Sequence, residues 1–199
     1  MSWYTVVCIA SGPSLTADDV ERVRQWRHAE GQDYGRAVIV TNTTFRIAPW
    51  ADLLYARDRQ WWLTYVDEVA TTFAGERASL GELRPQFGLI PAGAFEHYNN
   101  SGAAAISLAA HRGAVKIVML GYDCQHTNGR THWHGDHPPT LGNAGSVHVW
   151  MDGFRALAAA LADVTVINAS RATAIDLWPR MALEVALAQA TEPPVAAGC

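Results

Sequence analysis

The sequence lacks a long apolar run and contains few cysteines. None of its apolar runs approaches the roughly 20 residues that a membrane-spanning helix requires. The first ten residues have no positive stretch ahead of their apolar run and no small-residue cleavage site, so no signal peptide is predicted. Cys8, Cys124 and Cys199 form no Cys-x-x-Cys pair, which fits a reducing compartment. We therefore expect a soluble, cytoplasmic protein without structural disulfides.

Clustered basic charge is also missing. The chain has 15 lysines and arginines against 19 aspartates and glutamates, a formal net charge of -4, and its basic residues are scattered. Binding to duplex nucleic acid requires Lys and Arg gathered on one surface to neutralise phosphates. We expect no duplex nucleic acid as a partner, and the sequence leaves the oligomeric state open, a homo-oligomer included.

Apolar runs rich in β-branched residues alternate along the chain with segments of helical periodicity. This alternation is typical of β-α-β units that close a mostly parallel sheet. It predicts an α/β, Rossmann-like fold with helices on both faces of the sheet, in a single domain over residues 1–190. Residues 191–199 hold two prolines and no periodicity, and we expect a flexible tail there.

The predicted elements follow from periodicity and from turn and capping signals. Strands are expected over residues 3–9, 36–41, 52–56, 115–120 and 164–167, with a short additional strand near 87–90. Helices are expected over residues 16–29, 102–112, 147–161 and 179–190, with another that includes Trp61 and Trp62. Ser101 is the expected cap of the helix over 102–112. Residues 121–145 form a long, His-rich connection, and such loops are often functional.

Polar residues gather where the predicted strands end. In open parallel sheets the carboxyl ends of the strands form the edge that hosts a ligand. A pocket for a small molecule is therefore predicted from Ser11, Gly12, Pro13, Ser14, Asn42, Asp58, Asp123, Asn168 and Ser170.

The turn Gly12-Pro13-Ser14 has two interpretations. Its backbone N–H groups and the following helix N-terminus could hold a phosphate, because unpaired amides and the helix dipole both favour an anion. It could equally be a structural turn in which Ser14 or Thr16 caps the helix. The turn matches neither the Gly-x-Gly-x-x-Gly dinucleotide fingerprint nor a Walker-type loop.

Four stretches in a fixed order carry a resemblance to a known family. They are Ser-Gly-Pro-Ser-Leu at 11–15, Thr-Asn-Thr-Thr-Phe-Arg at 41–46, Asn-Ser-Gly through Gly-Tyr-Asp at 100–123, and Val-Ile-Asn-Ala-Ser at 166–170. Over about residues 4–185 the chain resembles the sialyltransferase-like Rossmann group, especially its short phage and prophage members. That group includes bacterial lipo-oligosaccharide sialyltransferases, motility accessory glycosyltransferases and archaeal 6-hydroxymethylpterin pyrophosphokinases.

The resemblance implies roles for individual residues. Gly12, Pro13 and Ser14 would line the nucleotide phosphates, Asn42 would touch the activated donor, and Ser101 and Gly102 would face the nucleotide. Asp123 would hold ribose hydroxyls or, as in the pyrophosphokinases, a Mg²⁺ ion. Ser11 departs from the sialyltransferases, which usually have asparagine there, and their tyrosine-rich phosphate clamp has no aligned counterpart in this chain.

The segment Thr-His-Trp-His-Gly-Asp-His-Pro carries three histidines, His132, His134 and His137. A histidine there could be the general base for an acceptor hydroxyl, the role that a loop histidine has in the resembling sialyltransferases. With Asp136, the three could instead hold zinc or another transition metal, although they lack the helical spacing of His-Glu-x-x-His. They could also be hydrogen-bonding loop residues.

Aromatic residues lie near two of the predicted site elements. Asp58 precedes Trp61 and Trp62, and Trp62 could stack on a base or sugar, although a Trp pair at a helix start is more often core and Asp58 could simply cap that helix. Trp150, Phe154 and Leu157 follow a helical stripe that we assign to the core.

The sequence as a whole predicts a transferase that uses a nucleotide-activated donor and is glycosyltransferase-like. The alternatives are a Mg²⁺-dependent pyrophosphokinase, a non-catalytic nucleotide-binding module, and a metal-dependent hydrolase built on the His-rich loop. No covalent cofactor is expected.

Overall fold

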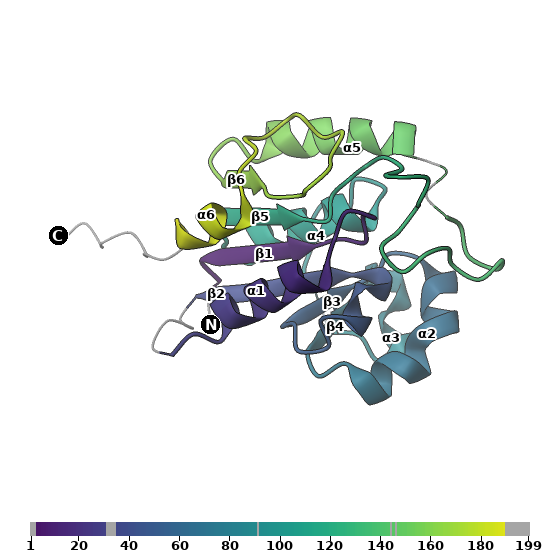
Figure 1. Cartoon of the computed structure of the whole chain (residues 1–199). Helices are drawn as coiled ribbons and strands as arrows, with labels where there is room; N and C mark the ends of the chain where they lie inside the picture. Colours follow the sequence, from purple (N-terminus) through teal and green to yellow (C-terminus); the bar gives the residue numbers. More distant parts are fainter. Residues whose placement is uncertain (1–2, 31–34, 91, 144, 146, 190–199) are drawn as a thin grey trace.

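A six-stranded, all-parallel sheet forms the centre of the molecule, with strand order β4-β3-β2-β1-β5-β6 (Figure 1). The computed structural model describes residues 3–30, 35–90, 92–143, 145 and 147–189. The α/β, Rossmann-like fold is confirmed.

The strands are β1 (Thr5–Ile9), β2 (Arg36–Thr41), β3 (Leu53–Tyr55), β4 (Glu76–Ala78), β5 (Lys116–Leu120) and β6 (Thr165–Asn168). The helices are α1 (Ala17–Arg27), α2 (Arg59–Thr72), α3 (Arg84–Phe87), α4 (Ser101–His111), α5 (Val147–Ala160) and α6 (Leu183–Ala188), with short 3-10 segments at Asn42–Arg46 and Gly81–Leu83.

Helices cover both faces of the sheet, as predicted. Successive strand residues point to opposite faces, so Val38 and Val40 pack in one apolar cluster while Ala37 and Ile39 pack in another. The first cluster includes residues of α1, α2 and α6, and the second includes residues of α4 and α5. Strands buried on both sides explain the near-continuous apolar runs of the sequence.

The order of the strands reverses beside β1. From β1 the chain builds outward through β2, β3 and β4, and it then returns to place β5 and β6 on the other side of β1. The loops after β1 and β5 therefore diverge at the carboxyl edge of the sheet. Such a switch point is where open α/β sheets leave a crevice for a ligand.

The short strand expected near residues 87–90 is wrong. Phe87 ends helix α3, and the additional strand is β4, at Glu76–Ala78. The apolar residues Phe87 and Leu89, which suggested a strand, pack in the core without belonging to the sheet. An edge strand of three residues that begins with an exposed glutamate carries no apolar alternation by which it could be recognised.

The structure also corrects two helix ends. α4 is capped by Asn100, whose Oδ1 accepts from the Ala103 amide at 2.6 Å, while Ser101 is its first helical residue. The helix expected over 179–190 is only α6, because the segment before it pairs with the end of β6 through the Asn168–Arg180 bridge. The tail expected over 191–199 lies outside the described residues.

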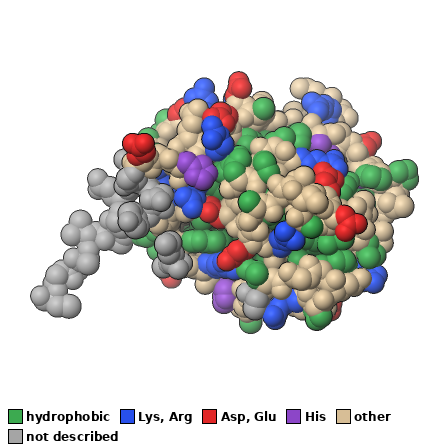
Figure 2. Space-filling model, turned by 90° about the horizontal axis from the view of Figure 1, so that it is seen from below, with side chains coloured by type: hydrophobic (Ala, Val, Ile, Leu, Met, Phe, Trp, Pro, Cys, Tyr) green, Lys and Arg blue, Asp and Glu red, His purple; other side chains and the backbone are tan. Residues whose placement is uncertain are grey.

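Two global features accompany this fold. Among the helices that the structure describes, none is long and apolar enough to cross a membrane. On the face shown in Figure 2, acidic and basic side chains are interspersed, without a broad region of one sign.

Candidate functional site

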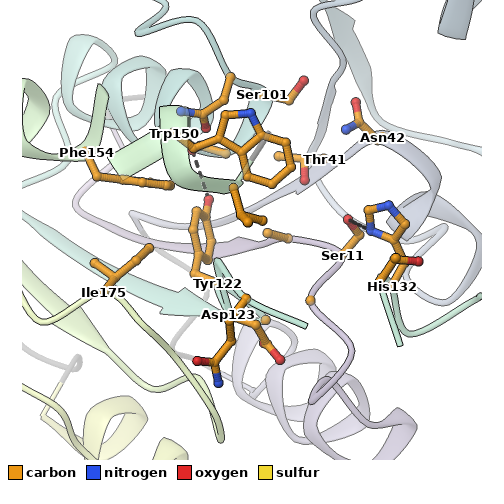
Figure 3. Close-up of a pocket in the computed structure, with 18 of the residues that line it drawn as sticks. Ser11, Thr41, Asn42, Ser101, Tyr122, Asp123, His132, Trp150, Phe154 and Ile175 are labelled. Carbon is orange, nitrogen blue, oxygen red and sulfur yellow. Dashed lines mark hydrogen bonds between the residues drawn. The ribbon is translucent and has the colours of Figure 1, made fainter. Parts of the chain in front are cut away.

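A pocket of about 260 Å³ opens at the carboxyl edge of the sheet, at the β1/β5 switch point. It is lined from the loops after β1, β2, β3, β5 and β6, from the first turn of α4 and from α5 (Figure 3). Nine of the residues singled out from the sequence line it: Ser11, Gly12, Pro13, Asn42, Asp58, Ser101, Gly102, Asp123 and His132.

Three predicted pocket residues instead hold loops together behind the lining. Ser170 Oγ accepts from the Tyr122 amide at 2.8 Å, and the Ser170 amide donates to Asn168 Oδ1 at 3.1 Å. Ser14 Oγ accepts from the Ala172 amide at 3.2 Å. These side chains therefore fix the ends of β1, β5 and β6 relative to one another.

Asp123 is a buried hydrogen-bond acceptor. Its carboxylate, in a residue only 1% exposed, accepts from the Ser14 amide at 2.9 Å, from Ser14 Oγ at 2.7 Å and from Thr127 Oγ1 at 3.0 Å. Burial raises the pKa of this carboxyl above its ordinary value, against the opposing effect of the hydrogen bonds from Ser14 and Thr127. The side chain thus joins the β1 and β5 loops at the floor of the pocket.

The amides of the Gly12-Pro13-Ser14 turn are already bonded within the protein. Gly12 N donates to Gly121 O at 2.8 Å, Ser14 N donates to Asp123, and proline has no N–H. The first turn of α1 carries Asp18 and Asp19, which oppose an anion at that helix end. A phosphate would therefore have to displace Asp123 to reach Ser14. Gly12 and Pro13 contribute to the pocket wall instead.

Three lining residues each present a buried polar atom that has no partner in the part of the chain that the structure describes. These atoms are Asn42 Oδ1, Arg57 Nε and His132 Nε2. Asn42 also has φ 48°, a left-handed conformation that costs free energy for a residue other than glycine. Buried polar atoms almost always have partners in native proteins, so these three are the side-chain atoms of the pocket lining that remain available for a hydrogen bond.

Arg57 is a pocket residue that no pattern in the sequence singles out. Its backbone amide donates to Ser101 Oγ at 3.1 Å, and its Nη2 donates to Asn99 Oδ1 at 3.3 Å. Its Nη1 lies 4.0 Å from Asp58, whose side chain is 65% exposed. Asp58 occupies the cap position of α2 without a side-chain capping bond. The guanidinium is therefore held at the pocket by weak contacts that leave it able to bind an anion.

An apolar wall made by Tyr122, Val147, Trp150, Phe154 and Ile175 closes another part of the pocket. The assignment of Phe154 to the core is confirmed, and Trp150 packs against the same cluster, but both side chains also line the pocket. The assignment of Leu157 to the core is confirmed.

Trp62 cannot stack on a ligand in this structure. It is fully buried, and its Nε1 donates to Ala56 O at 2.9 Å. The interpretation of the Trp61-Trp62 pair as core residues is confirmed.

The His-rich loop is attached to the end of β1. Ser11 Oγ and His132 Nδ1 lie 3.1 Å apart, and the Trp133 amide donates to Ser11 O at 3.1 Å. The rings of His132, His134 and His137 form a cluster with centroid separations of 5.0, 5.0 and 4.8 Å. Of the three, only His132 lines the pocket.

Burial keeps the clustered imidazoles neutral. It lowers the pKa of His132 to about 4 and that of His134 to about 3, and the neighbouring histidines add to both effects. Burial and then Arg46 lower the pKa of His137. When Nδ1 of neutral His132 carries the ring proton and donates it to Ser11 Oγ, Nε2 is unprotonated and can accept a proton, as a weaker base than an exposed histidine because its pKa is lowered.

The metal interpretation of the His-rich loop receives no geometric support. Asp136 accepts from Thr131 Oγ1 at 2.6 Å. Over the described ranges, no group of three or more His, Cys, Asp or Glu side chains is arranged to hold a metal ion.

Comparison of the chain with protein-family models, with curated proteins and with solved structures found no match. A candidate function therefore depends on the geometry of the pocket and on the resemblance in sequence.

Proposed function

We propose that this protein is a transferase that binds a nucleotide-activated donor at the β1/β5 switch point and is glycosyltransferase-like. The observation that carries the proposal is that three residues lining one pocket, Asn42, Arg57 and His132, each have a buried polar side-chain atom with no partner among the described residues. They supply an acceptor for a donor hydroxyl or amine, a cation for a phosphate and a neutral base. These are the groups that transfer from a phosphate-linked donor requires.

In the proposed reaction, Arg57 holds the phosphate and Asn42 orients the donor. The acceptor hydroxyl oxygen bonds to the donor's sugar carbon, and the bond from that carbon to the phosphate oxygen breaks. The hydroxyl proton passes to His132 Nε2, and the nucleotide leaves with its electron pair, its charge stabilised by the guanidinium.

Two features of the pocket favour sugar transfer over pyrophosphoryl transfer. A triphosphate substrate needs Mg²⁺, and the carboxylate that would hold it, Asp123, already accepts three hydrogen bonds. Arg57 contributes the only Lys or Arg side chain among the residues that line the pocket, and Asp58 and Asp123 contribute two carboxylates. One phosphate charge fits this balance better than three.

The test is thermal unfolding with nucleoside mono-, di- and triphosphates and their sugar conjugates, with and without Mg²⁺ and Zn²⁺. A ligand at about 100 times its dissociation constant adds roughly 2.7 kcal/mol to the free energy of unfolding. We expect a base-selective shift for wild type that Asn42→Ala abolishes. Asn128→Ala is the matched control, because Asn128 has the same backbone conformation, φ 52°, at an exposed position outside the pocket.

The outcomes separate the alternatives. Absence of any nucleotide shift, with stabilisation by Zn²⁺ alone, would move the chemistry to the histidine cluster and contradict the proposal. Binding without turnover of any sugar conjugate would favour a non-catalytic module. For a transferase, His132→Gln keeps the nucleotide shift and loses turnover.

A further inference from the structure

The pocket has two chemically different ends. Figure 3 shows Trp150, Phe154, Tyr122 and Ile175 on one side and Ser11, Asn42 and His132 on the other. The unpaired polar atoms belong to residues of the second side and to Arg57. A ligand that satisfies both ends must carry an apolar or aromatic group at one end and polar, charged groups at the other.

The apolar end is built as a fixed wall with one partly open member. Phe154 is held between two rings, with centroids 6.1 Å from Tyr122 and 6.4 Å from Trp178. The Tyr122 hydroxyl donates to Gly102 O at 3.1 Å, so it is occupied within the wall. Trp150, one turn before Phe154 on α5, is only half-buried. Its indole is therefore the surface of the wall that a planar ring can cover.

The size of the pocket limits what this ring can be. At about 260 Å³ it lies just below the roughly 300 to 1,000 Å³ typical of ligand pockets. One ring system with a sugar and a phosphate fits that space. A flat heterocycle gains most from such a site, because aromatic faces stack on indole at a cost in desolvation lower than that of a charged group.

We propose that the nucleobase of the donor stacks on Trp150 against the α5 wall, with its phosphate directed to Arg57. This inference rests on the proposed function and adds the orientation of the ligand to it. The base thus lies on the β5 side of the switch point and the transferred group on the β2 side, beside Asn42 and His132. Stacking is sequence-tolerant, since every base has a π-face, so Trp150 supplies affinity more than discrimination between bases.

The experiment measures the binding of the base and of the phosphate separately. Isothermal titration uses the nucleotide that most stabilises wild type, its phosphate-free nucleoside, and ribose 5-phosphate, on wild type, Trp150→Ala, Trp150→Phe and Arg57→Ala. We expect Trp150→Ala to weaken the nucleotide and the nucleoside about tenfold or more and to leave ribose 5-phosphate unchanged. Arg57→Ala should weaken the nucleotide and ribose 5-phosphate and leave the nucleoside unchanged, and Trp150→Phe keeps most of the affinity. Val149→Ala, the exposed neighbour on α5, is the control and changes nothing.

A second measurement needs no variant. Nuclear Overhauser effects between the base protons and the Trp150 indole in wild-type protein are expected, and their absence in a saturated complex overturns the proposed orientation. Unchanged nucleotide affinity in folded Trp150→Ala overturns it too. If wild type binds no nucleotide at all, the proposed function itself is overturned, so the two failures are distinguishable.

Discussion

Gly12 lies where the loop after β1 packs closely against the loop after β5. A Cβ added to it would lie 2.2 Å from Asp123 Oδ1 and 2.4 Å from Gly121 O. Neither neighbour can withdraw easily, because one is backbone and the other accepts three hydrogen bonds. We expect Gly12→Ala to lower the free energy of unfolding by roughly 1 to 3 kcal/mol, measured by urea denaturation.

Gly142→Ala is the matched control for that substitution. Among the described residues, apart from Gly142 itself and its two chain neighbours, no heavy atom lies within 4 Å of a Cβ built at Gly142. Its free energy of unfolding should stay within about 0.5 kcal/mol of the wild-type value. Equal effects of the two substitutions would show that the close approach at Gly12 is not what requires glycine.

Asn42 combines a left-handed backbone with an unpaired Oδ1. Asn42→Gly removes both the cost of the left-handed backbone and the unpaired oxygen, so we expect the free energy of unfolding to rise by about 0.5 to 1 kcal/mol. Because the side chain is lost, we also expect loss of nucleotide binding. Asn128→Gly relieves the same backbone conformation and should gain stability with binding intact. Calorimetric unfolding and ligand titration measure the two effects. If Asn42→Gly binds nucleotide as well as wild type does, the Asn42 side chain takes no part in binding.

The residues of the site differ in how far the sequence could predict them. Ser11, Asn42 and His132 are polar residues at strand ends or in a long loop, where a functional role can be inferred from pattern alone. Arg57 looks like any solvated arginine until β3 is placed beside α4. Trp150 belongs to an apolar helical stripe, and periodicity does not distinguish a core face from a pocket wall.

At the scale of the elements, α1 begins at a capping box that the sequence predicts and the structure confirms. The Asp19 amide donates to Thr16 Oγ1 at 3.2 Å, and the Thr16 amide donates to Asp19 Oδ2 at 3.2 Å. Arg171 forms a bidentate pair with the same carboxylate, at 2.8 Å for both contacts, and so attaches the loop after β6 to the helix. The cap is therefore part of the tertiary structure.

Thr16→Ala should lower the free energy of unfolding by about 1 kcal/mol, because it removes a helix cap. Thr71→Ala, at an exposed position in α2 where the hydroxyl only donates back to the helix, should change it by less than about 0.5 kcal/mol. Thermal and urea unfolding of both variants measure the difference. A Thr16→Ala effect no larger than that of Thr71→Ala would mean that Arg171 fixes Asp19 without the cap.

The predictability of elements follows their burial. The bounds predicted for β2 are those observed, because a strand buried on both faces has an unbroken apolar centre, here residues 37–40. β4 escapes prediction because it is short, polar and at the edge of the sheet. The α4 cap is misplaced by one residue, since Asn100 and Ser101 are both good capping residues and only the backbone decides between them.

At the scale of the whole molecule, the site exists because distant loops meet. Strand order places the β1, β2, β3 and β5 ends at one edge, and the order reverses beside β1. Sequence pattern predicts the parallel sheet, and the carboxyl edge follows from it, but pairing order depends on contacts between segments far apart in the chain. That is why the pocket's location could be predicted from general rules while its apolar wall and its guanidinium could not.

The buried imidazoles make the stability of the whole molecule depend on pH. The pKa is lowered to about 4 for His132 and to about 3 for His134, with burial as the largest cause, while an unfolded histidine titrates near 6.5. Below about pH 6.5 the unfolded chain therefore binds more protons than the folded one, and the free energy of unfolding falls as the pH drops. At pH 5.5 each of these two histidines lowers it by on the order of 1 kcal/mol. The raised pKa of Asp123 acts in the opposite direction, but only near the range where carboxyls titrate.

His134→Gln tests this dependence, since glutamine does not titrate and His134 lies outside the pocket lining. Urea unfolding at pH 8, 7, 6 and 5.5 should give wild type and variant curves that differ by a constant above pH 7 and converge, or cross, as the pH falls. Between pH 7 and 5.5 the free energy of unfolding of the variant should fall by less than that of wild type. The difference between the two is the contribution of His134. Curves that stay parallel down to pH 5.5 would mean that His134 takes up its proton in the folded state, so that the cluster with His132 and His137 is open to water and not a neutral, buried base.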